Sequence, residues 1–295
     1  LNKVGSEVSV AQSIGAQNMQ DARSYASHNV TIAFIISVCW AAILFVFANP
    51  IIGIYKLAPG ISSDAVDYLR IVSTAFPFIF LSAAFTGIYN ASGRSTIPFY
   101  ITGTGLILNI ILDPLFIFVF KLGVHGAAYA TWIAQGFVFF LVVYQLRVRD
   151  VLLDRFPFFT RLEARFSKRI FKLGAPVATF NTLFSFVNMF LGRTSSAQGG
   201  HIGLTSLTTG GQIEGVTWTT SQGFSTALSA FLAQNYAAGK LERGRKAYIY
   251  TIRLMLGTGI VVSTVLVIFG GPWFGIIIPE ADTIGSGAAY LDIIG

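Results

Sequence analysis

Charged residues are scarce in this chain of 295 residues. Asp, Glu, Lys and Arg make up 11% of it and apolar residues 54%, whereas charged residues make up about 25% of a typical soluble domain. A soluble core could not bury so large a share of apolar side chains, but a lipid bilayer would solvate them. The composition therefore argues against a soluble protein and predicts one that crosses a membrane several times.

Cysteine and recognisable catalytic motifs are also nearly absent. The single cysteine, Cys39, excludes an intrachain disulfide. The three histidines (His28, His125 and His201) are assigned to loops and do not cluster, so we expect no histidine metal site. No GxxxxGK[ST], HExxH or GxSxG pattern occurs. We therefore expect neither an enzyme nor nucleotide-driven transport, and no cofactor.

Positive charge is present, and it is concentrated in two connectors. Eight of the 20 Lys and Arg residues lie between Arg147 and Lys172, and another basic cluster lies at 240–246. Basic residues in short loops between apolar segments mark the cytoplasmic side of a membrane. We therefore place connectors 147–169 and 234–248 in the cytoplasm, with the chain in the cell (inner or plasma) membrane. The same distribution argues against nucleic acid as a partner.

Apolar segments of membrane-spanning length follow one another along the chain. The predicted spans are 29–54, 67–90 with a kink at Pro77, 97–120, 124–146, 170–191, 203–233, 249–269 and one that begins at 288. Segment 203–233 is only weakly apolar, but both basic connectors fall on the same side only if it spans. Residues 1–20 resemble the polar end of a helix whose beginning is missing. The predicted fold class is all-α and polytopic.

A shift of 222 residues superimposes the two ends of the chain without a gap. The matching positions include the pairs Arg23 and Arg245, Pro50 and Pro272, Gly53 and Gly275, and Tyr68 and Tyr290. One period holds an even number of spans, so the repeats would run parallel, as in several transporter folds. We predict two six-helix lobes, with residues 1–146 in the first and 170–295 in the second. The full protein would have twelve helices, of which this chain holds seven complete and two partial ones.

An acid at membrane depth is the strongest pointer to a site in the first lobe. Asp113 follows Asn109 by one helical turn, and Pro114 frees the carbonyl of Ile110. These oxygens could bind Na⁺, or a desolvated Asp113 could carry a proton instead. The alternative is that Asp113 is solvated near the outer surface or pairs with another helix.

A second acid lies in the weakly apolar segment. Glu214 is followed at helical spacing by Trp218 and Gln222, which continue a polar stripe with an aromatic side chain in it. Such a stripe suits a cavity for polar or cationic substrates, with Trp218 able to stack on a cation. The alternative is polar helix packing through small residues.

Four stretches carry a resemblance to a known family. GIYNASGRSTIP (87–98), NIILDPLFIF (109–118), GVHGAAYAT (123–131) and QGFSTALSAFLAQNYAAGKLERGRKA (222–247) resemble the multidrug and toxic compound extrusion (MATE) family, DinF-like type. The resemblance implies twelve helices and export of organic cations in exchange for Na⁺ or H⁺ by alternating access. It implies a monomer in contact with membrane lipid and small-molecule organic cations.

The resemblance also implies an ion site in the first lobe. Asn109 and Asp113 match the family's fifth-helix pair, Thr131 matches a sixth-helix threonine, and Tyr68 is a weaker match on the fourth helix. The family's first-helix Asp cannot be compared, because we expect the given sequence to begin after that helix. The alternative function is a lipid-linked saccharide flippase of the same superfamily, which ranks second because basic residues at depth are few.

Overall fold

The computed structural model describes residues 2–53, 59–149, 153, 155–278 and 281–294. These residues form helices and turns and contain no strand. The chain divides into two compact units, Leu1–Ala175 and Pro176–Gly295. The prediction of a polytopic all-α fold is confirmed.

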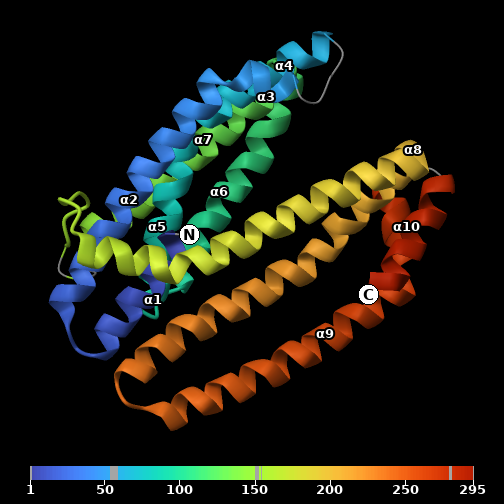
Figure 1. Ribbon diagram of the computed structural model, residues 1–295. Coiled ribbons are helices and arrows are strands. Elements are labelled where there is room, and N and C mark those ends of the chain that lie inside the picture. Colours follow the sequence, from blue (N-terminus) through green and yellow to red (C-terminus); the bar gives the residue numbers. More distant parts are fainter. Residues whose placement is uncertain (1, 54–58, 150–152, 154, 279–280, 295) are drawn as a thin grey trace. The chain divides into compact units, whose positions relative to one another are not determined.

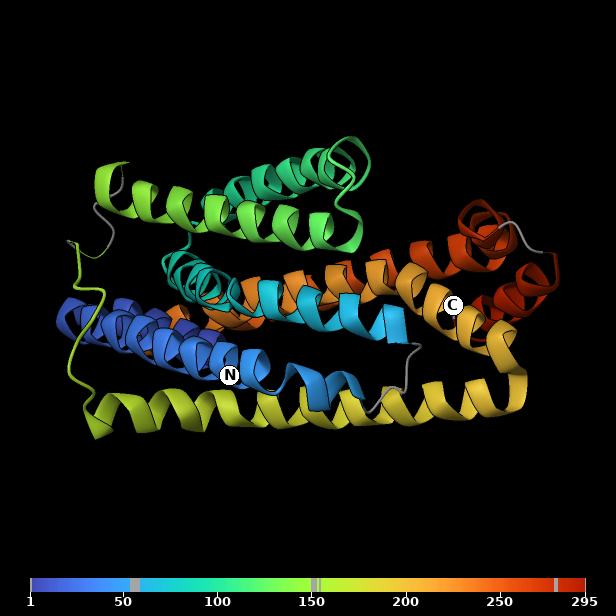
Figure 2. The same ribbon diagram turned by 90° about the horizontal axis from the view of Figure 1, so that it is seen from above.

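The first unit contains most of the helices. Their bounds are α1 (Asn2–Gly15), α2 (Met19–Val46), α3 (Ala48–Gly53), α4 (Pro59–Ser73), α5 (Phe76–Ala91), α6 (Thr96–Pro114), the π-helical turn η1 (Leu115–Val119), α7 (Gly123–Tyr144) and the π-helical turn η2 (Gln145–Arg149). Helix α2 packs against α1, α4 and α5, and α7 packs against α4, α5 and α6 (Figures 1 and 2). The fully buried side chains where these helices meet include Phe85, Ile88 and Tyr89 of α5 and Val30 of α2.

Helix α8 (Ala164–Ala237) begins in the first unit and continues through the second, where α9 (Leu241–Ile277) and α10 (Ala281–Ile294) follow. We expected a loop between spans 170–191 and 203–233. Instead, residues on both sides are helical and the direction changes at Gly200 alone, with φ 57° and ψ −143°. Glycine adopts this conformation without steric cost, so no longer loop is needed. Figure 1 shows the chain reversing its direction within α8.

Five of the described helices are long and apolar enough to cross a membrane, or six if the bent pair α4–α5 counts as one span. The bend between Gly60–Ser73 and Phe76–Ala91 is 45°, which agrees with the kink predicted at Pro77. Segment 203–233 is helical, but it is not among these six. That this segment crosses the membrane therefore remains a prediction, based on the positive charge of the connectors on either side of it. Outward-facing side chains such as Phe99, Ile110 and Phe118 are more than half exposed, as suits helices that contact lipid.

The first connector is attached to α2 by hydrogen bonds. Thr31 Oγ1 accepts from the Thr160 N–H at 3.1 Å, and His28 Nε2 accepts from the Glu163 N–H at 3.0 Å. The prediction that His28 lies in a loop is wrong: it is 2% exposed within α2. Its Nδ1 lies 2.7 Å from the Ser24 carbonyl and must donate, so the ring is the neutral Nδ1–H tautomer. Helix α8 begins at Ala164, inside the predicted connector 147–169.

Replacing His28 with alanine should loosen this attachment. The partly buried Glu163 N–H would lose its acceptor, which costs about 1.4 kcal/mol, near the lower end of the range for an unpaired donor. We expect trypsin to cleave after the exposed Arg161 about tenfold faster. A loss of about 1.4 kcal/mol raises the equilibrium constant for local opening of the connector tenfold. His125→Ala is the matched control, because His125 pairs with Asp67 on α4 and not with the connector. Equal cleavage rates in the two variants would contradict this role for His28.

Candidate functional site

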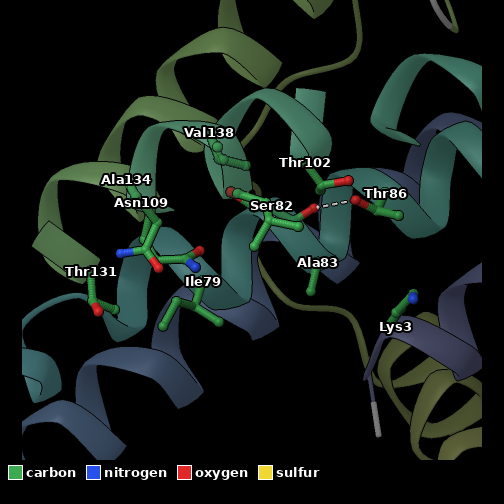
Figure 3. A pocket seen from close by; sticks show the side chains of 13 residues that line it. Lys3, Ile79, Ser82, Ala83, Thr86, Thr102, Asn109, Thr131, Ala134 and Val138 are labelled. Atoms are coloured by element: carbon green, nitrogen blue, oxygen red, sulfur yellow. Dashed lines mark hydrogen bonds between the residues drawn. The ribbon is translucent and has the colours of Figure 1, made fainter. Parts of the chain in front are cut away.

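A pocket of about 360 Å³ opens among α5, α6 and α7 of the first unit, and we call it the N-lobe pocket. Its lining residues are Lys3, Ile79, Ser82, Ala83, Thr86, Thr102, Gly105, Leu106, Asn109, Thr131, Ala134, Gln135 and Val138. Figure 3 shows Asn109 and Thr131 at one end, and Thr86, Thr102 and Lys3 at the other. The pocket therefore carries polar groups at both ends, with Ser82 and apolar side chains between them.

Close packing of α6 on α7 forms one wall of the N-lobe pocket. A Cβ added at Gly105 would lie 2.1 Å from Val138 Cγ2. A Cβ at Gly126 would lie 2.8 Å from the backbone carbonyl of Phe116. Small residues permit this approach between membrane helices. The packing brings Asn109 of α6 and Thr131 of α7 to the same pocket.

Asp113 lies beside the N-lobe pocket rather than in its lining. Asn109 Nδ2 donates to Asp113 Oδ1 at 3.3 Å, as expected for residues one turn apart. Both side chains are half-buried. The bond uses the amide donor, so the Asn109 carbonyl oxygen and Asp113 Oδ2 can act as acceptors. Together with Thr131 Oγ1 these oxygens form a donor set of the kind that hard cations prefer.

The backbone next to Asp113 departs from regular α-helix. Pro114 ends α6, and Leu115–Val119 forms the π-helical turn η1. Proline removes a backbone donor, and π-helical turns are common at functional sites. The acid thus lies at the point where its helix changes its hydrogen-bonding pattern.

Tyr68 is not brought to this site. It lines a separate pocket of about 460 Å³ with Ile52, Ile61, Asp64, Ala65, Leu69 and Val124. The two pockets share no lining residue. The structure therefore places Asn109 and Thr131 in the lining of one pocket, with Asp113 bonded to Asn109, and places Tyr68 in the lining of another.

The second candidate site lies in the second unit around Glu214. Trp218 Nε1 donates to Glu214 Oε1 at 2.8 Å, and the Tyr290 hydroxyl donates to Glu214 Oε2 at 3.2 Å. Trp218 also lies against Phe184, with ring centroids 5.4 Å apart. Gln222 is exposed. The site thus consists of an acid with both oxygens bonded and an aromatic wall.

Tyr290 is the partner of Glu214 that sequence analysis missed. It packs on a buried apolar cluster of Ile213, Leu266, Phe274 and Leu291. The internal repeat did align Tyr290 with Tyr68, which was a usable signal. It was not connected to Glu214, because these two residues are 76 positions apart.

Comparison with known proteins identifies the family. The MatE family model matches residues 3–115 and 176–295, which together cover most of the chain. The chain belongs to the MatE family. The resemblance to this family that the sequence carries is therefore confirmed.

Individual relatives agree with this assignment, and a solved structure shares the fold. A probable multidrug resistance protein YoeA from Bacillus subtilis is 26% identical over 95% of this chain and 62% of its own length. A probable multidrug resistance protein NorM from Thermotoga maritima is 26% identical over 88% of this chain and 57% of its own. A MOP superfamily transporter from Pyrococcus furiosus superimposes with a TM-score of 0.88 at 22% identity, over 98% of this chain and 65% of that one. The chain thus spans about three fifths of the length of these MatE relatives.

In this MatE chain, the position of Tyr290 depends on the absence of a side chain at residue 210. A Cβ at Gly210 would lie 2.3 Å from Tyr290 Cδ1, whereas one at Gly211 would meet nothing within 4 Å. We expect Gly210→Ala to displace Tyr290 from Glu214 and to lower the free energy of unfolding by about 1–3 kcal/mol. Gly211→Ala is the matched control, and it should stabilise the helix by up to about 1 kcal/mol. Thermal unfolding of both variants in detergent measures the difference, and equal shifts would contradict this packing of Tyr290.

Proposed function

We propose that the protein containing this chain is a secondary active antiporter that exports organic cations in exchange for Na⁺ or H⁺. The observation that carries the proposal is the Asn109–Asp113 hydrogen bond beside the N-lobe pocket, with Thr131 on the facing helix. An acid, an amide oxygen and a hydroxyl at membrane depth can bind Na⁺, and the acid can instead take up a proton. Asp113 is the proposed coupling residue, and Asn109 and Thr131 complete its site.

Binding of the coupling ion would change the bonding of Asp113 and thereby the packing of α6. The flanking π-helical turn η1 and the bend between α4 and α5 are places where these helices can change shape. A change of this kind is what alternating access requires of a transporter lobe. Because Tyr68 lines another pocket, we leave it out of the proposed coupling site.

The substrate would contact Glu214 and Trp218 in the second unit. A carboxylate and an aromatic face together suit an organic cation. The relatives from Bacillus subtilis and Thermotoga maritima are named as multidrug resistance proteins, which favours efflux over the flippase alternative. Gln222, which is exposed one turn beyond Trp218, is proposed to extend this contact surface.

Transport driven by defined gradients tests this function. We expect a fluorescent organic cation to leave vesicles containing the protein when either an inward Na⁺ gradient or an inward proton gradient is imposed, and not without one. The gradient that drives efflux names the coupling ion. No efflux under either gradient, from protein shown to be folded, would refute the antiporter proposal.

We also propose that the basic connectors 147–169 and 234–248 face the cytoplasm, on the positive-inside bias. In a variant with Cys39 replaced by serine, a membrane-impermeant maleimide should label Ser63→Cys in intact cells. It should label Arg161→Cys and Arg243→Cys only after the cells are opened. Labelling of Arg161→Cys in intact cells would reverse the proposed orientation.

A further inference from the structure

A buried acid lies on α1, away from the Asn109–Asp113 pair. Glu7 is 3% exposed, and its Oε1 has no hydrogen-bond partner among the described residues. The side chain of Asn90, on α5, hydrogen-bonds to the carboxyl group. Lys3, one helical turn earlier on α1, acts on it electrostatically. The acid is therefore only partly satisfied in its ionised form.

Burial of a carboxylate under these conditions is costly. Burial of a polar atom without a hydrogen-bond partner costs about 1–3 kcal/mol of folding free energy, and more when the group is charged. Buried acids commonly avoid this cost by taking up a proton. One amide donor and one cation at the edge of a pocket do not provide the full set of bonds that an ionised carboxylate accepts.

Lys3 is the charged residue that acts electrostatically on the Glu7 carboxyl group. The neighbouring elements α2, α5 and the start of α8 carry the titratable residues Asp21, Arg23, Tyr25, His28, Cys39, Tyr89, Arg165, Lys168, Arg169 and Lys172. Asp21 pairs with Arg165 at 3.3 Å, and Arg169 donates to Gln12. His28 is bonded to Ser24 and Glu163. Asn90 is the α5 group that reaches the carboxyl.

Lys3 connects this acid to the N-lobe pocket. Lys3 lines the pocket at the end opposite Asn109, as Figure 3 shows. Lys3 and Glu7 both pack over Gly87 of α5: a Cβ built there would lie 3.3 Å from Lys3 Cγ and 3.8 Å from Glu7 Cβ. An ionised Glu7 would leave the pair neutral, whereas a protonated Glu7 would leave the Lys3 charge uncompensated.

We propose that Glu7 is a proton-binding residue whose protonation sets the net charge that the Lys3–Glu7 pair presents to the N-lobe pocket. The step is the reversible transfer of one proton from water to the Glu7 carboxylate. It is independent of Asp113, so it does not require that residue to couple transport. A ligand in this pocket would meet a neutral pair at high pH and a positive charge at low pH.

The proton on Glu7 can be observed directly. The infrared band of a protonated carboxyl group should disappear as the pH is raised in the purified protein, in the Asp113→Asn background as well as in the wild type. The band should be missing in Glu7→Gln at every pH. Persistence of the same titrating band in Glu7→Gln would overturn the proposal.

A second variant tests the link to Lys3 while leaving Glu7 in place. Lys3→Met removes the positive charge that favours the ionised acid, so the midpoint of the titration should move to higher pH by about 1 unit. Lys3→Arg keeps the charge and should leave the midpoint near its wild-type value. A purely structural role for Lys3 predicts no shift, so an unmoved midpoint in Lys3→Met would overturn the link even if Glu7→Gln does not fold.

Discussion

Asp113→Asn should abolish gradient-driven export while leaving the protein folded and inserted in the membrane. The substitution keeps the size of the side chain, but it removes the negative charge that a Na⁺ ion or a proton would neutralise. Changes to the outer shell of an ion site cost about 10–100-fold in affinity, so loss of the acid itself should cost about 100-fold or more. Cation efflux from vesicles under the driving gradient, normalised to the amount of folded protein, measures the effect.

Asp64→Asn is the matched control for this experiment. Asp64 is an acid of the same unit, but it is exposed and lines the separate pocket that contains Tyr68. We expect its replacement to leave efflux within about twofold of the wild type, as is usual for surface substitutions. If Asp113→Asn transported as well as Asp64→Asn does, the assignment of the coupling site would be wrong.

Gly5→Ala should strongly destabilise the first unit. A Cβ at Gly5 would lie 2.0 Å from the Ile170 carbonyl oxygen and 2.8 Å from its carbonyl carbon. These are backbone atoms of a fully buried residue, so they cannot turn aside as a side chain could. We expect a loss of about 3 kcal/mol, the upper end of the usual cost of overpacking. Thermal unfolding in detergent measures it.

Gly103→Ala on α6 is the control for Gly5→Ala. A Cβ at Gly103 would have no neighbour within 4 Å. Alanine there should therefore stabilise the helix by up to about 1 kcal/mol through its higher helix propensity. Opposite signs in the two variants would establish that the start of α8 is held against α1. A Gly5→Ala protein as stable as the wild type would exclude this contact.

The local features of the structure could be predicted from the sequence because they depend on nearby residues. The bend before α5 follows from Pro77, and the Asn109–Asp113 bond follows from a spacing of one helical turn. The apolar segments predicted as spans correspond to helices for the same reason, because length and hydropathy are local properties. The sharp break at Gly200 was missed, since a polar, glycine-rich stretch also suits an ordinary loop.

The long-range features could not be predicted in this way. Periodicity showed that Glu214 and Trp218 share a face, but the bond from Tyr290 depends on how α10 packs in the second unit. Burial of His28 under the connector depends on where residues 156–163 pass over α2. Glu7 looked like part of a polar helix end, and only its packing against α5 shows that the carboxyl group is buried.

Release of the coupling ion on substrate binding would test the coupling role of Asp113 most directly. Purified protein would be loaded with radioactive Na⁺, or followed with a pH-sensitive dye in weak buffer, and then mixed with an organic cation. We expect the wild-type protein to release one of the two ions and Asp113→Asn to release neither. Equal release from Asp113→Asn and from the wild type would show that the coupling ion binds elsewhere and would contradict the proposed coupling mechanism.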